Sequence, residues 1–269
     1  MAIFVIGDLH LSLGADKPMD VFPGWEGYLP KLERNWRALI APEDTVVLAG
    51  DTSWAMKLED TRADFAFLQS LPGRKWMLKG NHDYWWTTAR KMESYLAAEG
   101  FDSLHILHNN CCRVGDTALC GTRGWPFDDA AAQSAKIMAR EAGRLKMSLE
   151  AGKDAAQIIA FLHYPPVFGN TDAAELTGLL RAYGVRRCYY GHLHGKAIRY
   201  AVQGERGGVQ YKLISADGLA FCPYKLEMYA ANQRLLAKIS VKTLVFLRRT
   251  CYNILYFFVW RTSNEPDLL

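Results

Sequence analysis

Five short apolar runs of this chain end abruptly in glycine or in polar residues, and this repeated pattern limits the fold more than any other feature. The runs read "AIFVIGDLH", "TVVLAGD", "KWMLKGNHD", "QIIAFLHY" and "RRCYYGHLHG". Short, continuous apolar runs are typical of strands that are buried on both faces of a sheet. In such α/β sheets, ligands gather beyond the carboxyl ends of the strands. The pattern therefore predicts an α/β fold with a binding site at that edge.

Segments with helical periodicity alternate with these runs. They cover residues 28–40, 57–70, 87–98, 128–150 and 172–184. Two stretches, residues 114–125 and 197–221, contain turn-forming glycines and predict further, partly antiparallel strands. Strands and helices thus alternate along the chain, as an α/β fold requires.

The length and composition fit a globular protein with a sizeable core. The chain has 269 residues, of which 50% are hydrophobic. Its first residues, "MAIFVIGDLH", do not read as a secretory leader, so we expect a cytoplasmic protein. The six cysteines lack CxxC spacing and are expected to be reduced thiols, with the neighbours Cys111 and Cys112 on opposite faces of a strand.

The net charge of +4 is confined to the C-terminal part of the chain. Residues 231–269 hold six basic and two acidic residues, whereas the first 230 residues hold 26 of each. A balanced body offers no basic face to a long nucleic-acid backbone, so we expect no extended nucleic-acid surface. The charge asymmetry predicts a main domain over residues 1–230 and a basic extension over residues 231–269.

The extension predicts a basic amphipathic helix. Over residues 231–249 the basic side chains fall within an arc of about 120° when successive residues are about 100° apart. Eleven uncharged residues follow, too few to span a bilayer. Peripheral contact with an anionic membrane is one interpretation of this segment. A helix docked on the protein's own body or on a second subunit, or a poorly ordered end, is the other.

Seven side chains that can bind divalent metal ions stand at the ends of the five apolar runs: Asp8, His10, Asp51, Asn81, His163, His192 and His194. In DxH and HxH, alternate residues of an extended segment lie on one face, so both can reach one ion. Seven donors exceed what one tetrahedral ion uses, whereas a pair of ions about 3.5 to 4 Å apart can hydrolyse phosphate esters. The pattern favours a two-metal site, and His105 and His108, outside it, are expected to be structural.

The five motifs together resemble the signature of the calcineurin-like metallophosphoesterases. That signature reads DxH, GD, GNH followed by Asp or Glu, a single His, and GHxH; here it stands as "GDLH", "GD", "GNHD", "LHYPP" and "GHLH" over residues 8–194. The resemblance implies a four-layer α/β/β/α sandwich with mixed sheets, in which residues 1–230 form the catalytic domain. It implies that Asp51 bridges two metals, of which one is bound by Asp8, His10 and His194 and the other by Asn81, His163 and His192.

The resemblance also implies a dinuclear metal-dependent phosphoesterase that hydrolyses a phosphate ester by attack of a metal-bound hydroxide. His82 would face the phosphate, stabilise the developing charge and donate a proton to the leaving oxygen. Asp83 would either orient the His82 ring or cap the helix that begins near Thr87. Manganese is expected by family likeness, and iron, zinc, nickel and cobalt accept the same donors.

Two departures from subfamily patterns narrow the activity. Protein serine/threonine phosphatases of this superfamily extend the second motif to GDxxDRG, whereas this chain reads "GDTSWAM". Purple acid phosphatases have a tyrosine ligand where this chain has Trp54, whose indole cannot coordinate a metal. A phosphatase or phosphodiesterase acting on a small molecule or nucleotide remains. The alternatives are a membrane-surface hydrolase of a lipid-linked phosphate or pyrophosphate, resting on the extension, and a catalytically inactive binding scaffold.

Arg123 and Trp85 are the predicted substrate contacts. Arg123 follows a predicted strand, and its guanidinium suits a phosphate oxygen, with a surface salt bridge as the alternative. Trp85 is one of several aromatic residues after the strand ends that can stack on a flat group. Packing in the core or under a loop is the alternative for each of these rings. The sequence carries no signal of the oligomeric state.

Overall fold

Two mixed β-sheets carry the motifs at the carboxyl ends of their strands. In the computed structural model, which describes residues 1–125 and 131–227, the first sheet has the strand order β13-β1-β2-β3-β4. Its strands are β1 (Ile3–Ile6), β2 (Thr45–Leu48), β3 (Arg74–Met77), β4 (Leu104–Ile106) and β13 (Tyr224–Lys225). Strands β1 to β4 are parallel, and β13 pairs with β1 in the antiparallel sense.

The second sheet has the order β11-β12-β10-β7-β6-β5. Its strands are β5 (Cys111–Val114), β6 (Thr117–Thr122), β7 (Gln157–Leu162), β10 (Arg187–Tyr190), β11 (Gly204–Arg206) and β12 (Val209–Leu213). The four central strands are parallel, and the two edge strands, β5 and β11, are antiparallel to their neighbours. A separate small hairpin consists of β8 (Val167–Phe168) and β9 (Thr171–Asp172).

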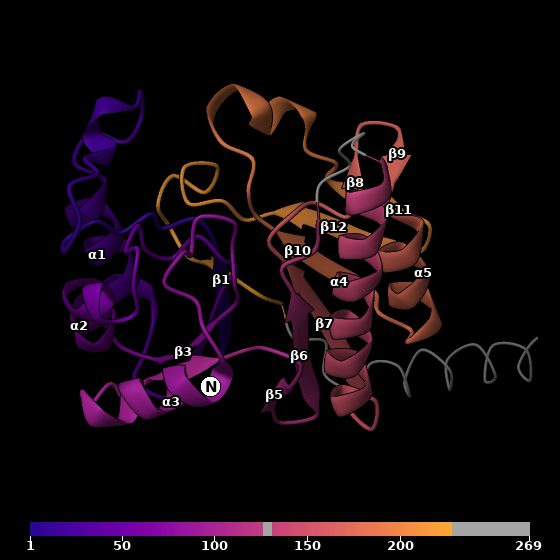
Figure 1. Cartoon of the computed structure of the whole chain (residues 1–269), viewed down its shortest axis with the longest axis horizontal. Helices are drawn as coiled ribbons and strands as arrows, with labels where there is room; N and C mark the ends of the chain where they lie inside the picture. The colour runs from indigo at the N-terminus through magenta and orange to yellow at the C-terminus, as the bar shows by residue number, and fades with distance from the viewer. Residues whose placement is uncertain (126–130, 228–269) are drawn as a thin grey trace, which may run out of the picture. The chain divides into compact units, whose positions relative to one another are not determined.

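Helices connect the strands at the predicted places. The described α-helices are α1 (Tyr28–Leu39), α2 (Arg62–Ser70), α3 (Ala89–Ala98), α4 (Ala131–Gly152) and α5 (Ala174–Ala182). Short 3-10 helices lie at η1 (Met19–Val21), η2 (Glu59–Thr61) and η3 (Gly195–Tyr200). Figure 1 shows α1, α2 and α3 beside the first sheet, and α4 and α5 beside the second. The predicted segment 57–70 divides into η2 and α2.

The strands β1, β2, β6 and β10 are buried on both faces. Alternate residues of a strand point in opposite directions, so the two faces belong to different clusters. In β1, Phe4 and Ile6 belong to a core cluster that includes residues of α1, α2 and α3, whereas Ile3 and Val5 pack in a second cluster with Phe161 of the other sheet. A third cluster joins the second sheet to α4 and α5. The α/β class is confirmed, and the three clusters join each sheet to its helices and the two sheets to each other.

The hairpin β5-β6 begins at the pair of cysteines, which are expected to lie on a strand, and continues into the predicted hairpin-like stretch 114–125. Cys111 packs toward the cluster with α4, and Cys112 is buried between the sheets, so the two thiols lie on opposite faces as expected. Both are free thiols. Residues Met1–Leu226 form one compact unit. The predicted amphipathic helix of the extension, residues 231–269, lies outside the described residues. Within residues 1–125 and 131–227, no helix is both long and apolar enough to cross a membrane.

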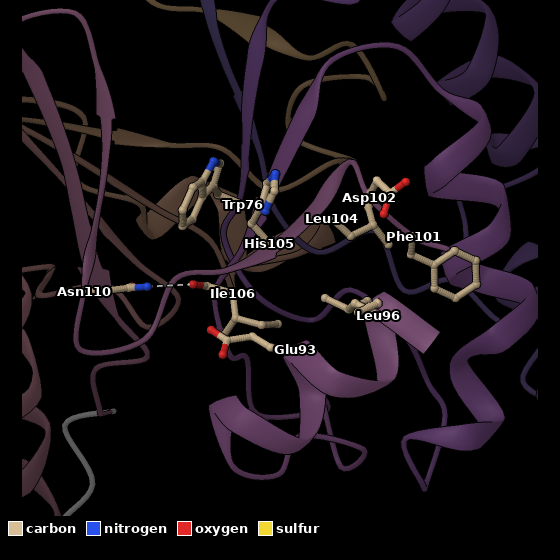
Figure 2. Close-up of a pocket in the computed structure, with 10 residues that line it drawn as sticks. Trp76, Glu93, Leu96, Phe101, Asp102, Leu104, His105, Ile106 and Asn110 are labelled. Carbon is tan, nitrogen blue, oxygen red and sulfur yellow. Dashed lines mark hydrogen bonds between the residues drawn. The ribbon is translucent and has the colours of Figure 1, made fainter. Parts of the chain in front are cut away.

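Strand β4 forms one edge of the first sheet, and a groove of about 250 Å³ runs beside it. The Asn110 amide donates a hydrogen bond to the carbonyl of Ile106 at 3.0 Å (Figure 2). His105, Ile106 and Asn110 all line this groove beside β4. The ring centroid of His105 is 4.9 Å from that of Trp76. His105 thus packs at a sheet edge, as expected of a structural histidine.

Candidate metal centre

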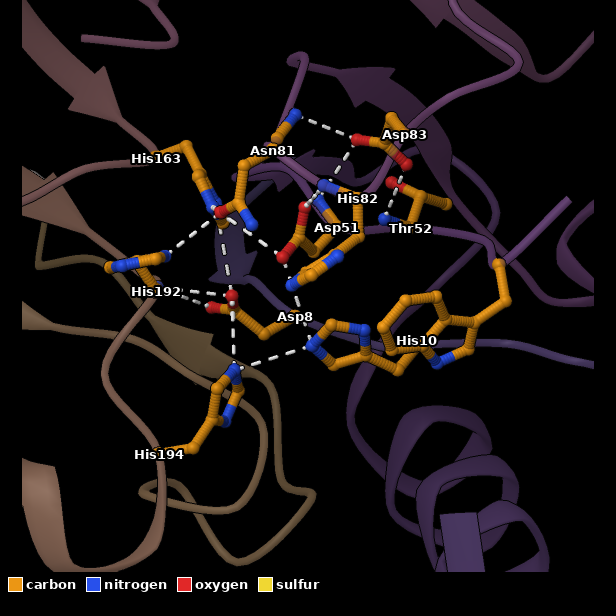
Figure 3. A network of polar contacts seen from close by, with 12 residues as sticks. Asp8, His10, Asp51, Thr52, Asn81, His82, Asp83, His163, His192 and His194 are labelled. Carbon is orange, nitrogen blue, oxygen red and sulfur yellow. Dashed lines mark hydrogen bonds and ion pairs between the residues drawn. The ribbon is translucent and has the colours of Figure 1, made fainter. Parts of the chain in front are cut away.

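The structure brings all seven predicted ligands together where the two sheets end (Figure 3). The first sheet supplies four of them through the segments that follow β1, β2 and β3: Asp8, His10, Asp51 and Asn81. The second sheet supplies the other three through the segments that follow β7 and β10: His163, His192 and His194. The carboxyl ends of parallel strands meet at one edge, which is why residues so distant in the sequence share one site.

Asp8, His10 and His194 form the first group of potential metal ligands, with their ligand atoms within 4.8 Å of one another. The His194 Nε2 atom lies 3.3 Å from Asp8 Oδ1 and 3.3 Å from His10 Nε2. Two imidazole nitrogens that face each other in this way can both offer a lone pair to a cation. This group has the composition that the resemblance implies for one metal.

Asp8, Asp51 and His163 form the second group. The His163 Nε2 atom lies 3.5 Å from Asp51 Oδ2, and its Nδ1 atom lies 3.7 Å from Asp8 Oδ1. Asp51 Oδ2 is also 3.8 Å from His10 Nε2, a member of the first group. Asp8 belongs to both groups, whereas the family resemblance implies that it binds one metal only.

Asn81 and His192 complete the cluster on the side of the second group. The Asn81 Oδ1 atom lies 2.6 Å from His163 Nε2 and 2.9 Å from His192 Nδ1. The backbone N–H of His192 donates to both carboxylate oxygens of Asp8, at 3.0 Å each. The amide oxygen and the two imidazoles therefore converge, and they offer neutral donors beside the charged carboxylates.

Four of the seven residues have a left-handed backbone conformation. Their φ angles are 60° for Asp8, 47° for His10, 49° for Asp51 and 73° for His192. A positive φ is uncommon outside glycine, and a strained residue costs about 1–3 kcal/mol. Only three other non-glycine residues of the described chain have a positive φ. The strain is concentrated where each chain segment leaves its strand and turns a ligand inward, which marks a functional site.

Glycines precede the ligands because the backbone passes very close to the carboxylates. A Cβ atom on Gly80 would overlap the carboxylate of Asp51, and one on Gly191 would overlap the carboxylate of Asp8. The glycines of GNH and GHxH are thus required by close approach.

The two carboxylates are buried and repel each other. Asp8 is 0% exposed and Asp51 is 1% exposed. Burial, together with the neighbouring charge of Asp8, raises the pKa of Asp51 to about 8. Burial also opposes the ionisation of Asp8, but its hydrogen bond with His194 and the charges of nearby imidazoles outweigh this effect and lower its pKa. A cation between two such carboxylates relieves their repulsion, so the donor set fits divalent metal ions.

Burial also favours the neutral, metal-binding form of most of the imidazoles. It lowers the pKa of His10 to about 3 and that of His192 to about 4, and neighbouring histidines add to both shifts. His194 differs from them. Burial would lower its pKa, but hydrogen bonds with Asp217 and Asp8 raise it to about 10.

The His82 ring lies beside the two groups and belongs to neither of them. Its backbone N–H donates to Asp51 Oδ1 at 2.7 Å. The ring centroid is 4.5 Å from that of Trp54 and 5.8 Å from that of His10, and the Tyr84 hydroxyl lies 3.4 Å from Nδ1. Burial and neighbouring histidines lower its pKa. A half-buried ring in this position can exchange a proton with a molecule bound at the metal ligands.

Asp83 ties the third motif to the second, which corrects both predicted roles of this residue. Its carboxylate accepts hydrogen bonds of 2.7–3.3 Å from the Trp85 indole and from the backbone N–H groups of Asp51, Thr52, Ser53 and Gly80. The N-cap of α3 is Thr88, not Asp83. The polar side-chain contact of the His82 ring within the described residues is with the Tyr84 hydroxyl.

Trp85 lies in the core, which corrects the prediction that it contacts substrate. Its side chain is 2% exposed, and its ring centroid is 5.1 Å from that of Phe65. Trp54 and Tyr84 are the aromatic side chains beside His82, and Tyr84 is 54% exposed. An aromatic residue that follows a strand end therefore does not by itself identify a substrate contact.

Arg123 forms an ion pair with a buried glutamate. Its guanidinium lies 3.4 Å from Glu141 Oε1, and the Arg144 guanidinium lies 2.6 Å from the same oxygen. The Glu141 side chain is 0% exposed and that of Arg123 is 16% exposed. The Arg123 carbonyl accepts a hydrogen bond from the N–H of His163 at 3.2 Å. The backbone of Arg123 thus contacts the site through His163, while its side chain forms an ion pair with Glu141 of α4.

Asp217 is a site residue that the motifs do not include. Its Oδ1 atom lies 3.0 Å from His194 Nδ1. It follows β12 in "KLISADG", an apolar run that ends in Asp-Gly. The pattern of the five motifs, an apolar run that ends in polar residues, therefore occurs at a sixth strand end. This pattern is the sequence signal by which Asp217 could have been predicted.

Comparison with known proteins identifies a family and a fold. The family described as calcineurin-like phosphoesterase matches residues 1–196. The phosphopantetheinyl hydrolase of Mycobacterium tuberculosis superposes with a TM-score of 0.53 and 15% sequence identity, covering 85% of this chain and 98% of that chain. Protein TT1561 of Thermus thermophilus superposes with a TM-score of 0.51 and 13% identity, covering 84% and 97%. These two likenesses concern the fold alone. Curated proteins give no match.

Proposed function

The chain belongs to the calcineurin-like phosphoesterases, and we propose that it hydrolyses a phosphate ester of a small molecule or nucleotide with two divalent metal ions. Its family consists of metal-dependent phosphoester hydrolases. The observation that carries the proposal is the convergence of two ligand groups that share Asp8 and come from both sheets. A two-ion centre can polarise an ester phosphate and supply the attacking oxygen together.

Each of the two ions would have its own set of ligands. Asp8, His10 and His194 would hold one ion, Asn81, His163 and His192 would hold the other, and Asp51 would contribute to both; Asp8, which the two groups share, lies beside both positions. When bound, the ions supply a nucleophile at neutral pH and neutralise charge on the phosphate oxygens. Manganese is the first metal to test, and iron, zinc, nickel and cobalt are the others, because all of them accept imidazole and carboxylate donors.

His82 is the proposed general acid. Its ring is half-buried between Trp54 and Tyr84 and stands next to the ligand groups without belonging to them. Its backbone, not its ring, contacts Asp51. The ring is therefore available to stabilise charge on the phosphate and to donate a proton to the leaving oxygen. An inactive binding scaffold would have no need for this histidine beside a full set of ligands, which favours an enzyme.

A substrate screen tests the proposed function. The protein is loaded with Mn²⁺ and assayed side by side with p-nitrophenyl phosphate, bis-p-nitrophenyl phosphate, cyclic nucleotides and nucleotide-linked pyrophosphates. Turnover of the first substrate indicates a phosphatase, and turnover of the second indicates a phosphodiesterase. Absence of turnover with every metal and substrate would count against the proposal. The lipid-linked alternative depends on residues 231–269 and has no support from the described residues.

The variant His82→Ala tests the assigned role. We expect kcat to fall by about 10²- to 10⁴-fold, the usual contribution of a positioned general acid, with unchanged metal content. Metal content is retained because the backbone N–H that contacts Asp51 remains. His105→Ala is the matched control, since His105 is a histidine in the groove beside β4. If His82→Ala turns over substrate at the wild-type rate, His82 is not the acid.

A further inference from the structure

Asp217 lies behind His194, on the side of the ring that faces away from the other ligands. We propose that Asp217 is a positioning residue that fixes the orientation and tautomer in which His194 binds its metal ion; this inference rests on the metal centre of the proposed function. The carboxylate Oδ1 atom is 3.0 Å from His194 Nδ1, while His194 Nε2 is 3.3 Å from Asp8 Oδ1 and from His10 Nε2. The Nδ1 atom of the ring thus faces Asp217, and the Nε2 atom faces the other ligands of the first group.

Hydrogen bonds hold the Asp217 carboxylate in place. Its Oδ2 atom accepts the N–H of Gly195 at 2.8 Å, and its Oδ1 atom accepts the N–H of Gly218 at 2.9 Å. The side chain is 11% exposed. The carboxylate is therefore tied to the residue that directly follows His194 and to its own loop, so it cannot swing away without losing both contacts.

The loop that carries Asp217 is itself anchored to the first motif. The N–H of Gly7 donates to the carbonyl of Ile214 at 2.7 Å, and the N–H of Ala216 donates to the carbonyl of Gly7 at 3.0 Å. Gly7 directly precedes Asp8. The distance between the Asp217 carboxylate and the Asp8 carboxylate is thus set by backbone hydrogen bonds, and His194 fills the space between them.

This geometry favours the tautomer of His194 that can bind a metal ion through Nε2. A carboxylate accepts hydrogen bonds and donates none, so it requires a proton on Nδ1. Without a metal ion, Nε2 can also carry a proton and donate it to Asp8. To bind a metal ion, Nε2 must give up that proton, whereas the proton on Nδ1 stays in the bond to Asp217. The opposite tautomer would set the Nδ1 lone pair against a carboxylate and direct a proton at the metal position. The ring of Trp25, 5.8 Å away at 60°, packs against His194 and limits its rotation.

Such outer partners of metal-binding histidines raise ligand basicity, and their loss weakens metal binding by about 10- to 100-fold. We therefore expect Asp217→Ala to raise the Mn²⁺ dissociation constant of one site by about that factor, as measured by calorimetry without substrate. Asp217→Asn should give a smaller loss, because its single amide oxygen can still accept from Nδ1–H. Asp172→Ala is the control, since Asp172 forms an ion pair with Arg206 in the small β8-β9 hairpin.

A double-mutant cycle separates positioning from a merely structural role. If Asp217 acts through His194, Asp217→Ala has less than a twofold effect on residual Mn²⁺ binding in a His194→Ala background. Equal losses in both backgrounds, or no loss in the wild-type background, would overturn the proposal.

Should Asp217→Ala fail to fold, imidazole ¹⁵N spectra of the Zn²⁺-loaded wild-type protein show which nitrogen of His194 carries the proton and which binds the metal. Coordination through Nε2 with a proton on Nδ1 supports the proposal, and any other state of His194 refutes it. None of these measurements depends on turnover.

Discussion

Lys75 is a buried cation in β3, and its replacement by methionine should stabilise the protein at neutral pH. The side chain is 0% exposed. Its ammonium group donates to the carbonyl of Leu71 and to the hydroxyl of Ser103, the latter at 3.0 Å. Within residues 1–125 and 131–227, no carboxylate forms an ion pair with it. Burial, and after it the charge of Arg37, lowers the pKa of Lys75 from 10.5 to about 8.

The size of the effect follows from this pKa. The difference between 10.5 and about 8 corresponds to about 3 kcal/mol by which burial disfavours the charged form. Lys75→Met removes this cost but leaves the Leu71 carbonyl without its donor, which costs about 1–2 kcal/mol. Ser103 is still satisfied, because its hydroxyl donates to Gln69 at 2.6 Å. The expected net gain at pH 7 is about 1–2 kcal/mol of unfolding free energy.

The sign of the pH dependence is a stricter test. Between pH 8 and 10.5 the unfolded chain holds the Lys75 proton more tightly than the folded protein, so rising pH stabilises the wild type through this group. The advantage of Lys75→Met should therefore shrink over that range. Urea unfolding of both proteins at several pH values measures the difference, with the exposed Lys57→Met as control. A less stable variant at pH 7, or a difference that does not change with pH, would refute the reasoning.

Two further changes test the architecture of the metal centre. Gly80→Ala should weaken metal binding by more than about 10-fold while the fold persists, because its Cβ atom would overlap the Asp51 carboxylate. Gly143→Ala is the control, since a Cβ atom at Gly143 meets no other atom. Unchanged Mn²⁺ affinity of Gly80→Ala, measured by calorimetry, would contradict the close-approach argument. Asp83→Ala should lower the unfolding free energy by about 3 kcal/mol or more and weaken Mn²⁺ binding, because several buried N–H groups lose their acceptor. Thermal unfolding of the metal-free protein measures the stability change, and a loss below about 1 kcal/mol would show that these hydrogen bonds are replaced.

The sequence pattern predicted the fold class and the residues that converge in the candidate metal centre, both for one physical reason. Parallel strands place their carboxyl ends at one edge, so polar residues at the ends of buried apolar runs must meet there. The pattern does not contain the distances between side chains. It therefore could not show that Asp8 belongs to both ligand groups, or that Asp51 lies 3.8 Å from His10 across them.

The roles of Asp83, Trp85 and Arg123 depend on tertiary contacts that sequence spacing does not determine. Asp83 precedes a helix, which made a cap a reasonable expectation, but its partners are the backbone groups of a loop about 30 residues earlier. Trp85 and the exposed Tyr84 are neighbours in the chain, yet they face opposite environments because the turn after the third motif directs one inward. Arg123 faces Glu141, whose burial against β6 could not be inferred from helical periodicity alone.

Neither sheet holds a complete ligand set, and this couples metal binding to the packing of the two sheets. The carboxylates Asp8 and Asp51 come from the first sheet, whereas His163, His192 and His194 come from the second. The sheets are joined beside the site by the Gly7 N–H bond to Ile214 and by the contact of His163 Nδ1 with the carbonyl of Ala49 at 3.1 Å. A chain with separated sheets would keep only part of each group, so metal ions bind the native state in preference to the unfolded state. Bound metal should consequently raise the stability of the whole unit, Met1–Leu226, rather than that of one sheet.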